Sequence, residues 1–261
     1  MLHSADHDLI VAAARDAGAV ALSHFATPVR SWKKGGDSPV SDADIETDRR
    51  LQGLLRAARP DYGWLSEETE DDGSRLRSRR SFLADPLDGT RGFLAADPRW
   101  AVSVAVIEDG RPVAGVVHCP ALARTWSAFL GGGASLDGMP IRVEADARVR
   151  SLTGSKRILE ELAGHGGENV VLHPFIPSLA LRLAMVASGE IDGAFARPGA
   201  HDWDIAAADL LLAEAGGSLS TPAGEPCRYD RAGIRAPALV AASAGRRAAM
   251  LALAKGLRLN L

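Results

Sequence analysis

The sequence signature that points most directly to chemistry is the segment DPLDGT at residues 85–90. It follows a short apolar run at residues 81–84, which predicts a strand that ends here. Pro86 prevents a helix from starting at once, and Gly89 can adopt backbone angles that are closed to other residues. The segment therefore predicts a tight turn that gathers its polar groups on one side.

Three oxygen donors in this turn, the Asp85 and Asp88 carboxylates and the Leu87 carbonyl, can face one point. Ligands of this kind suit Mg²⁺, which commonly works together with a substrate phosphate. Thr90 then enters a helix whose first N–H groups are available to an anion. The turn thus predicts a hard-cation site beside a phosphate site.

Three further acidic positions could complete the site: Asp44 near the start of a predicted helix, the pair Glu67-Glu68 after a predicted strand, and Asp204 at the start of a late helix. Each has an ordinary explanation when taken alone. They could be a surface helix residue, a solvated pair and a favourable first-turn charge. Because these positions occur together with the turn at residues 85–90, we favour a shared site for all of them.

The periodicity of the apolar side chains predicts the elements that must position these residues. In chain order we expect helices at 6–25 and 42–58 around a turn-rich loop at 33–39, strands at 101–106, 113–117 and 125–130, a helix at 178–189, a strand at 191–196 and a helix at 203–214. This alternation indicates an α/β (α+β) protein with mixed layers. We predict a single domain, 1–261, with two tightly packed subdomains of about 1–150 and 151–261.

The composition is that of an ordinary globular protein, with 46% hydrophobic residues and a mean hydropathy near zero. No stretch approaches the roughly 20 apolar residues of a membrane span, and the first residues lack the pattern of a signal peptide. We therefore expect a cytoplasmic protein without a membrane partner. The net charge of −3 gives no support for a nucleic-acid polymer as partner.

Three other features receive structural interpretations. The glycine run at residues 131–134 could suggest a phosphate cradle, but no Gly-Lys-Ser/Thr follows, which favours a hairpin. The segment 69–80 passes from acidic to basic residues, and a solvated loop is favoured over a docking patch. Cys119 and Cys227 lie far apart without a metal-binding spacing, so we expect two reduced thiols.

The motifs can be compared with a known family once they are taken together. Ser66-Glu67-Glu68, the segment DPLDGT at 85–90, and WDIAA at 203–207 followed by EAGG at 214–217 resemble the inositol monophosphatase family of Mg²⁺-dependent phosphatases. Their order and spacing match from residue 40 to residue 217. The resemblance implies the layered αβαβα sandwich of the sugar-phosphatase type, hydrolysis of a phosphomonoester by metal-activated water, and often a homodimer.

The resemblance also implies roles for individual residues. One Mg²⁺ would be held by Glu67, Asp85 and the Leu87 carbonyl, a second by Asp85, Asp88 and Asp204, and a weaker third ion could lie near Glu67 with Asp44 reached through water. Asp44 and Thr90 would form a hydrogen-bonded pair that orients and deprotonates the attacking water. Backbone N–H groups of Gly89 and Thr90 would hold the phosphate.

Departures from the family pattern bear on the substrate. Inositol-specific members carry a Glu seven residues before the motif Asp, and here that position is Arg197, whose guanidinium suits a second phosphate. Lys33 or Lys34 could add to the same positive rim. The sequence TRGF at 90–93 also resembles bacterial 3′(2′),5′-bisphosphate nucleotidases. We expect a bisphosphate nucleotide as substrate, with inositol 1-phosphate, histidinol phosphate or a sugar phosphate as alternatives. A solvated Arg197 before Pro198 is the competing interpretation.

Two other functions compete with this one. Phosphatases of the haloacid dehalogenase type use the first Asp of an Asp-x-Asp-Gly-Thr motif as nucleophile, but here two residues separate the aspartates. A catalytically silent protein that binds metal or phosphate and interacts with a partner would be the non-enzyme alternative. The presence of every matched ligand argues against it.

Overall fold

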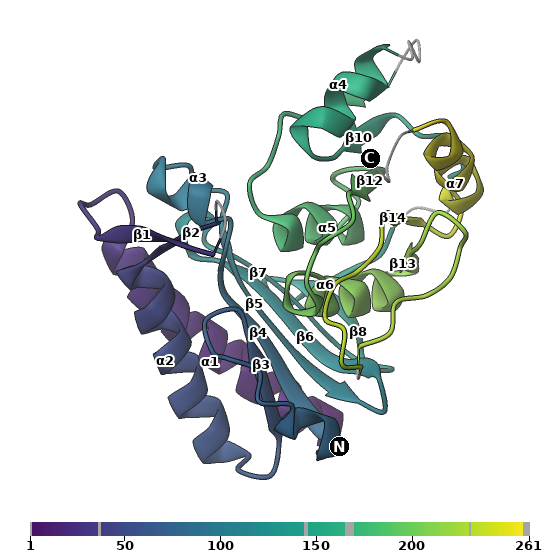
Figure 1. The fold of residues 1–261 in the computed structure, drawn as a ribbon. Helices are drawn as coiled ribbons and strands as arrows, with labels where there is room; N and C mark the ends of the chain where they lie inside the picture. The colour runs from purple at the N-terminus through teal and green to yellow at the C-terminus, as the bar shows by residue number, and fades with distance from the viewer. Residues whose placement is uncertain (1, 36–37, 144–145, 165–169, 230, 258–261) are drawn as a thin grey trace.

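The computed structural model describes residues 2–35, 38–143, 146–164, 170–229 and 231–257 (Figure 1). The helices are α1 (Leu2–His24), α2 (Asp42–Ala58), α3 (Thr90–Leu94), α4 (Lys156–Gly164), α5 (Leu179–Ala187), α6 (Asp202–Ala215) and α7 (Arg247–Gly256). The strands are β1 (Ser31–Lys34), β2 (Ser38–Ser41), β3 (Gly63–Ser66), β4 (Arg80–Asp88), β5 (Ala101–Glu108), β6 (Arg111–Cys119), β7 (Arg124–Phe129), β8 (Gly133–Leu136), β9 (Met139–Ile141), β10 (Ser151–Thr153), β11 (Val171–Leu172), β12 (Gly193–Ala196), β13 (Gly217–Ser220) and β14 (Leu239–Ser243).

Two sheets form the framework. The larger has the order β3-β4-β5-β6-β7-β8-β9 and is antiparallel except for the parallel pair β3 and β4. The smaller has the order β11-β10-β12-β14-β13, with parallel pairing on both sides of β10 and antiparallel pairing on both sides of β14. The boundary expected near residue 150 falls between the last strand of the larger sheet and the first of the smaller. The subdomain division itself stays a prediction.

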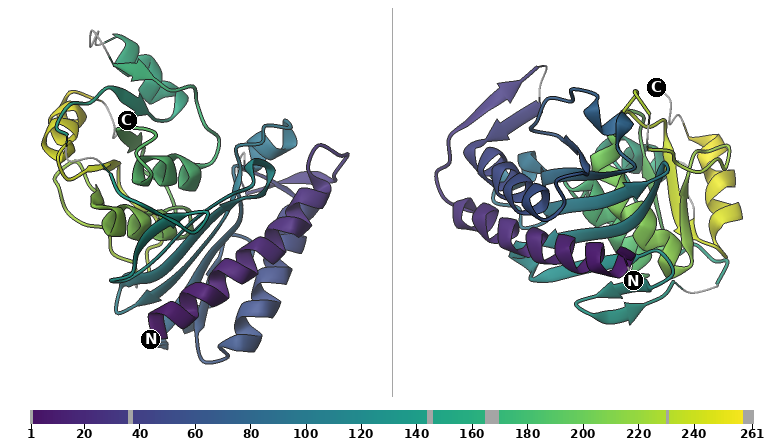
Figure 2. Two further views of the ribbon diagram at one scale, coloured as in Figure 1. Left: turned by 180° about the vertical axis from the view of Figure 1, so that it is seen from behind. Right: turned by 90° about the horizontal axis from the view of Figure 1, so that it is seen from below.

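Helices cover both faces of each sheet, which explains why the central strands read as nearly continuous apolar runs. In Figure 2, α1 and α2 lie along one face of the larger sheet, where they pack on β4, β5 and β6. On its other face α6 packs against β4 to β8, and α5 joins α6 to the smaller sheet. Apolar residues of α4 and α7 cluster on the outer side of the smaller sheet. This arrangement confirms the αβαβα sandwich.

Most of the expected elements are present, with small differences at their ends. The helix expected at 42–58 has these bounds, and the late helix runs over Asp202–Ala215 and ends at Gly216, whose φ is +91°. The strands expected around Asp109-Gly110 are β5 and β6, and both turn residues have positive φ, as a tight hairpin turn requires. Cys119 and Cys227 are both free thiols.

Two expectations need correction. The turn-rich loop expected at 33–39 contains most of the β1–β2 hairpin, although Gly36 and Asp37 lie outside the described residues. The segment 69–80 is not simply a solvated loop, because Arg75 and Arg80 are buried. Arg80 bonds the carboxylates of Asp6 and Glu108, each at 2.9 Å, so its charge is compensated inside the protein. None of the described helices is both long and apolar enough to cross a membrane.

Candidate functional site

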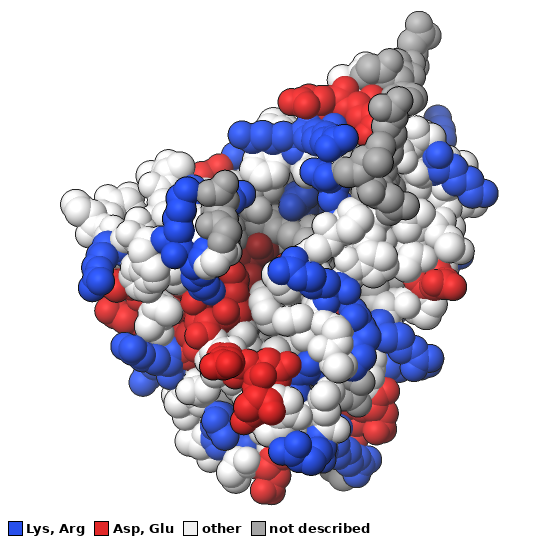
Figure 3. Space-filling model, in the orientation of Figure 1, with Lys and Arg blue, Asp and Glu red and all other residues white. Residues whose placement is uncertain are grey.

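The acidic residues of the motifs meet at a cavity of about 780 Å³ between the two halves of the fold. Its lining includes the five candidate metal ligands, Glu67, Asp85, Leu87, Asp88 and Asp204, together with Gly89 and Thr90. In the space-filling view of Figure 3, acidic side chains occupy a hollow, and Lys and Arg side chains stand around it. The structure thus brings together side chains that come from β3, β4, α3 and α6.

The strand expected over residues 81–84 is part of β4. This strand continues into the first four residues of the DPLDGT segment and ends at Asp88. Asp85 pairs with Ser103 and Asp88 with Ala101, and the register shifts between them. Pro86 has no N–H to donate to a ladder, and the Leu87 N–H instead donates to Asp85 Oδ1 at 3.0 Å. Asp85, Leu87 and Asp88, on both sides of this irregularity, all line the cavity.

Gly89 is the residue that allows β4 to turn into α3. Its φ is +100°, and a Cβ at this position would come within 3.1 Å of the backbone nitrogen of Ser178. Both facts require glycine. The following helix has only five residues, so an anion at its start would be held by individual N–H groups of Gly89 and Thr90 rather than by a long helix dipole.

Asp44 and Thr90 are in direct contact, as the family resemblance implied. The Thr90 hydroxyl donates to Asp44 Oδ1 at 2.8 Å and lies 3.1 Å from the Leu87 carbonyl oxygen. Asp44 Oδ2 accepts from the backbone N–H and the hydroxyl of Ser41, which caps the N-terminus of α2. Asp44 is 2% exposed, so this helix start and the Thr90 hydroxyl hold it in place.

Glu67 follows β3 and is held there by neighbours that the sequence did not indicate. The Ser66 hydroxyl donates to Asp48 of α2, which ties the end of β3 to a helix. Lys34 reaches the site from the β1–β2 hairpin and donates to the Glu67 carbonyl oxygen at 3.1 Å. Its Nζ lies 3.7 Å from Glu67 Oε1 and also pairs with Glu68.

Asp204 is the third residue of α6, and its Oδ2 accepts the backbone N–H of His201 at 2.8 Å. This capping-box contact fixes the carboxylate at the helix start. The imidazole of His201 lines the cavity and stacks on Trp203 with 4.5 Å between ring centroids. Burial and the nearby Arg235 and Lys34 lower the pKa of His201, which favours the neutral ring. Sequence reasoning did not identify His201.

Asp88 links the two halves of the site. Its Oδ2 accepts the hydroxyl of Ser178 and the backbone N–H of Ala180, both at 2.6 Å, at the start of α5. Arg182, one turn later, is buried and donates to the Ser178 carbonyl oxygen at 3.3 Å. Its guanidinium carbon lies 5.7 Å from the centre of the Phe175 ring. Burial lowers the pKa of Arg182, and the negative charges of Asp88 and Asp204 oppose this by favouring the charged guanidinium.

The acidic cluster carries more negative charge than its neighbours compensate. Burial, followed by repulsion from Glu67, Asp88 and Asp204, raises the pKa of Asp85 well above its usual value. Burial and the same kind of repulsion raise the pKa of Asp204. The pKa of Glu67 is raised to about 7, chiefly by burial and against the pull of Lys34. A cation bound among these carboxylates would relieve their mutual repulsion and lower their pKa values again. The cluster therefore favours the binding of a cation.

The donor set fits Mg²⁺ in its chemistry, since every ligand candidate supplies oxygen. Within the described parts of the chain, no three acidic, histidine or cysteine side chains stand close enough to form a closed metal shell by geometry alone. The fit therefore rests on the shared cavity and on the repulsion among Glu67, Asp85, Asp88 and Asp204. Rotation of these side chains can close such a shell around an ion.

The candidate substrate residues are placed less centrally. Lys33, Lys34 and Arg197 are not among the residues that line the cavity. Lys33 is exposed, and Arg197 is half-buried just after β12. Their contact with a substrate stays a prediction. Besides His201, the basic and aromatic side chains that line the cavity are Arg91, Arg99, Lys156 and Phe175. Arg91 belongs to the TRGF segment noted in the sequence, whereas no motif marked Arg99, Lys156 or Phe175.

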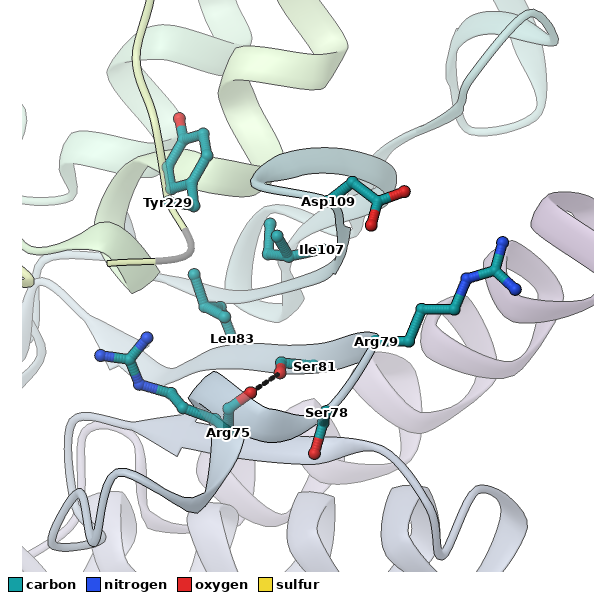
Figure 4. Close-up of a pocket in the computed structure, with 8 residues that line it drawn as sticks. All are labelled: Arg75, Ser78, Arg79, Ser81, Leu83, Ile107, Asp109 and Tyr229. Carbon is teal, nitrogen blue, oxygen red and sulfur yellow. Dashed lines mark hydrogen bonds between the residues drawn. The ribbon is translucent and has the colours of Figure 1, made fainter. Parts of the chain in front are cut away.

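Two other features have structural roles. The N–H groups of Gly131 and Gly133 donate to the Glu214 carboxylate, each at 2.9 Å, so the glycine run anchors a hairpin to α6. Figure 4 shows a separate cavity of about 10 Å³ beneath Tyr229, where the Ser81 hydroxyl donates to the Arg75 carbonyl oxygen. This volume accommodates about one water molecule and no substrate.

Comparison with known proteins agrees with this geometry. The sequence profile of the inositol monophosphatase family matches residues 5–255. The chain belongs to this family. This membership argues against the haloacid dehalogenase alternative, because the DPLDGT segment lies within the match to the inositol monophosphatase family.

Individual relatives cover most of the chain. An inositol-1-monophosphatase of Mesorhizobium japonicum is 34% identical over 250 residues, which are 90% of this chain and 92% of the relative. A 3′(2′),5′-bisphosphate nucleotidase CysQ of Aggregatibacter actinomycetemcomitans is 30% identical and covers 85% of this chain and 86% of its own. Among solved structures, Thermotoga maritima IMPase superposes with a TM-score of 0.86 at 26% identity, covering 95% of this chain and 96% of its own.

Proposed function

We propose that this inositol monophosphatase family member is a Mg²⁺-dependent phosphomonoesterase that hydrolyses a small phosphorylated metabolite. The observation that carries the proposal is the convergence of Glu67, Asp85, Asp88 and Asp204 on one cavity beside the hydrogen-bonded pair Asp44 and Thr90. Phosphate release from a generic phosphomonoester, with and without Mg²⁺, tests it. A well-folded protein that releases no phosphate with any tested substrate would support the silent binding protein instead.

In the proposed reaction the carboxylates of Glu67, Asp85, Asp88 and Asp204, with the Leu87 carbonyl, hold two or three Mg²⁺ ions. When bound, Mg²⁺ lowers the pKa of an attacking water and neutralises charge on the leaving oxygen. The Thr90 hydroxyl donates a hydrogen bond to Asp44, so the Thr90 oxygen can accept a hydrogen bond from the attacking water and orient it. As the water attacks, its proton would pass to Thr90 Oγ1 while the Thr90 proton moves to Asp44. The N–H groups of Gly89 and Thr90 hold the phosphate.

We further propose a substrate with two phosphates, such as a 3′(2′),5′-bisphosphate nucleotide. The cavity is large enough for a nucleotide, and Arg91, Arg99 and Lys156 add positive charge to its lining. The similarity to a bisphosphate nucleotidase CysQ agrees with this choice. Arg197 and Lys33 lie outside the lining, and their charges add to the field around the cavity.

We expect 3′-phosphoadenosine 5′-phosphate to be hydrolysed with a kcat/KM about ten- to a hundred-fold above that of inositol 1-phosphate. A charge-assisted hydrogen bond to a second phosphate contributes about 1.5–3 kcal/mol. Both substrates should be compared on one enzyme preparation at fixed Mg²⁺ and ionic strength, with histidinol phosphate and a sugar bisphosphate included. Equal or better activity on inositol 1-phosphate would instead identify an inositol monophosphatase.

We expect inhibition by Li⁺ at about millimolar concentration and by Ca²⁺, each in competition with Mg²⁺. Li⁺ suits hard oxygen ligands but carries half the charge of Mg²⁺, so it neutralises the acidic cluster less completely. Ca²⁺ takes more ligands in looser geometry, which misaligns the groups that Asp85 and Asp88 would position. Initial rates over a Mg²⁺ titration measure both effects. Rates indifferent to both ions would show that the carboxylates hold a different kind of site.

A further inference from the structure

The basic side chains that line the cavity differ in whether they already pair with a carboxylate of the protein. Arg99 donates through Nε and Nη2 to both oxygens of Asp97, at 2.8 and 2.6 Å, and Asp97 also lines the cavity. Arg91 likewise has an interaction partner. Lys156 is exposed, and its recorded contact is with the ring of Phe175, 5.5 Å from Nζ to the centroid. Within the described residues, no carboxylate pairs with Lys156, so its charge is available to a ligand.

Phe175 connects Lys156 to the acidic cluster. Its half-buried ring lines the cavity and also contacts the guanidinium of Arg182, which in turn feels the charges of Asp88 and Asp204. An aromatic face attracts a cation and restricts where a long lysine side chain can lie. Phe175 therefore supports Lys156 at a defined place in the lining of the cavity.

The position of Lys156 brings no evident benefit to its own helix. It is the first residue of α4 and is followed by Arg157, although the start of a helix favours negative charge. A residue that breaks a local rule and has no carboxylate among the described residues to offset its charge is a candidate for function. Arg157 shares the unfavourable position but does not line the cavity. The two neighbours thus form a natural comparison.

We propose that Lys156, supported by Phe175, is the specificity-determining residue that recognises a second anionic group of the substrate, such as a second phosphate. The inference rests on the proposed phosphatase function and names a residue that neither the motifs nor the comparisons indicate. The scissile phosphate lies at the acidic cluster, on the side of the larger sheet. A second anionic group of the substrate then reaches Lys156, which lines the same cavity from the start of α4, whereas a neutral polyol makes no charge-assisted contact there.

The test compares Lys156→Gln with the matched variant Arg157→Gln, which removes the same charge one residue away. The substrates are 3′-phosphoadenosine 5′-phosphate and adenosine 3′-monophosphate, which share base, sugar and 3′-phosphate. We expect Lys156→Gln to lower kcat/KM for the bisphosphate about tenfold, mainly through KM, and to leave the monophosphate unchanged. Arg157→Gln should affect neither substrate, and Lys156→Arg should retain most of the preference.

Two further readouts separate recognition from a structural role. The preference of the unmutated enzyme for the bisphosphate should fall as ionic strength rises, whereas that of Lys156→Gln should change little. Phe175→Leu should weaken the preference in the same direction, because the apolar volume is kept while the aromatic face is lost. Thermal unfolding of each variant verifies that the fold is intact.

The outcomes distinguish this inference from the function on which it rests. If the unmutated protein hydrolyses no phosphomonoester with Mg²⁺, the proposed function is wrong and the inference is wrong with it. If Mg²⁺-dependent hydrolysis is normal but Lys156→Gln leaves the ratio of the two substrates unchanged, the inference alone is overturned. An equal loss on both substrates would also overturn it, since a positioning defect of α4 would affect them alike.

Discussion

Asp88→Asn is expected to lower kcat by a factor on the order of 10²–10³ or more while the protein remains folded. The loss follows because Asp88 would serve the ion that stabilises the leaving oxygen, and an amide carries no charge. The fold should persist, because the amide oxygen of asparagine can still accept from Ser178 and Ala180, as Oδ2 of Asp88 does. Single-turnover rates at saturating Mg²⁺, with circular dichroism and thermal unfolding, measure both parts.

Asp97→Asn provides the matched control for this prediction. Asp97 lines the same cavity, but it is paired with Arg99 and lies outside the acidic cluster. Its neutralisation removes one negative charge from the cavity without removing a candidate metal ligand, so we expect a change in kcat of less than about fivefold, since a partly exposed ion pair contributes only about 0–1 kcal/mol. A near-normal rate for Asp88→Asn at saturating Mg²⁺ would contradict the two-metal assignment. Equal losses in both variants would indicate a general effect of cavity charge.

The parts of the site that could be predicted from the sequence are those carried by local motifs. Asp44 and Thr90 lie 46 residues apart, yet each belongs to a motif that defines its own backbone geometry, and the structure brings them to 2.8 Å. The helix that carries Asp44 begins at a capping box formed by Ser41 and Asp44, which is readable as a short sequence pattern. Local signals of this kind place a side chain before the tertiary fold is known.

The parts that could not be predicted depend on packing between distant segments. Lys34 meets Glu67 only because the β1–β2 hairpin folds over the end of β3, and hairpin contacts leave no motif in the sequence. Lys156 and Phe175 belong to the part of the chain that forms the smaller sheet. How the smaller sheet packs against the larger one decides which of its residues face the cavity. The course of β4 through the DPLDGT segment was also missed, because Pro86 normally argues against a strand interior. Here the register shift accommodates it.

The hydroxyl of Thr90 is expected to be as important as the ligand carboxylates, although it binds no metal in the proposed arrangement. Thr90→Val keeps the shape of the side chain and removes the hydroxyl, and we expect kcat to fall by about 10²–10⁴, the range of general acid–base catalysis. Thr90→Ser keeps the hydroxyl and should retain activity within about fivefold, because the 2.8 Å bond to Asp44 can still form.

Stability measurements decide whether such a loss is chemical or structural. In Thr90→Val the buried Asp44 Oδ1 loses its donor, which costs about 1–3 kcal/mol of unfolding free energy, while Oδ2 keeps its two bonds from Ser41. Denaturant unfolding should therefore show a modest loss that cannot account for a hundred-fold change in rate in the folded enzyme. Normal turnover by Thr90→Val would exclude a role for this hydroxyl in orienting water, and the Asp44 and Thr90 pair would then serve only to join α2 to β4 and α3.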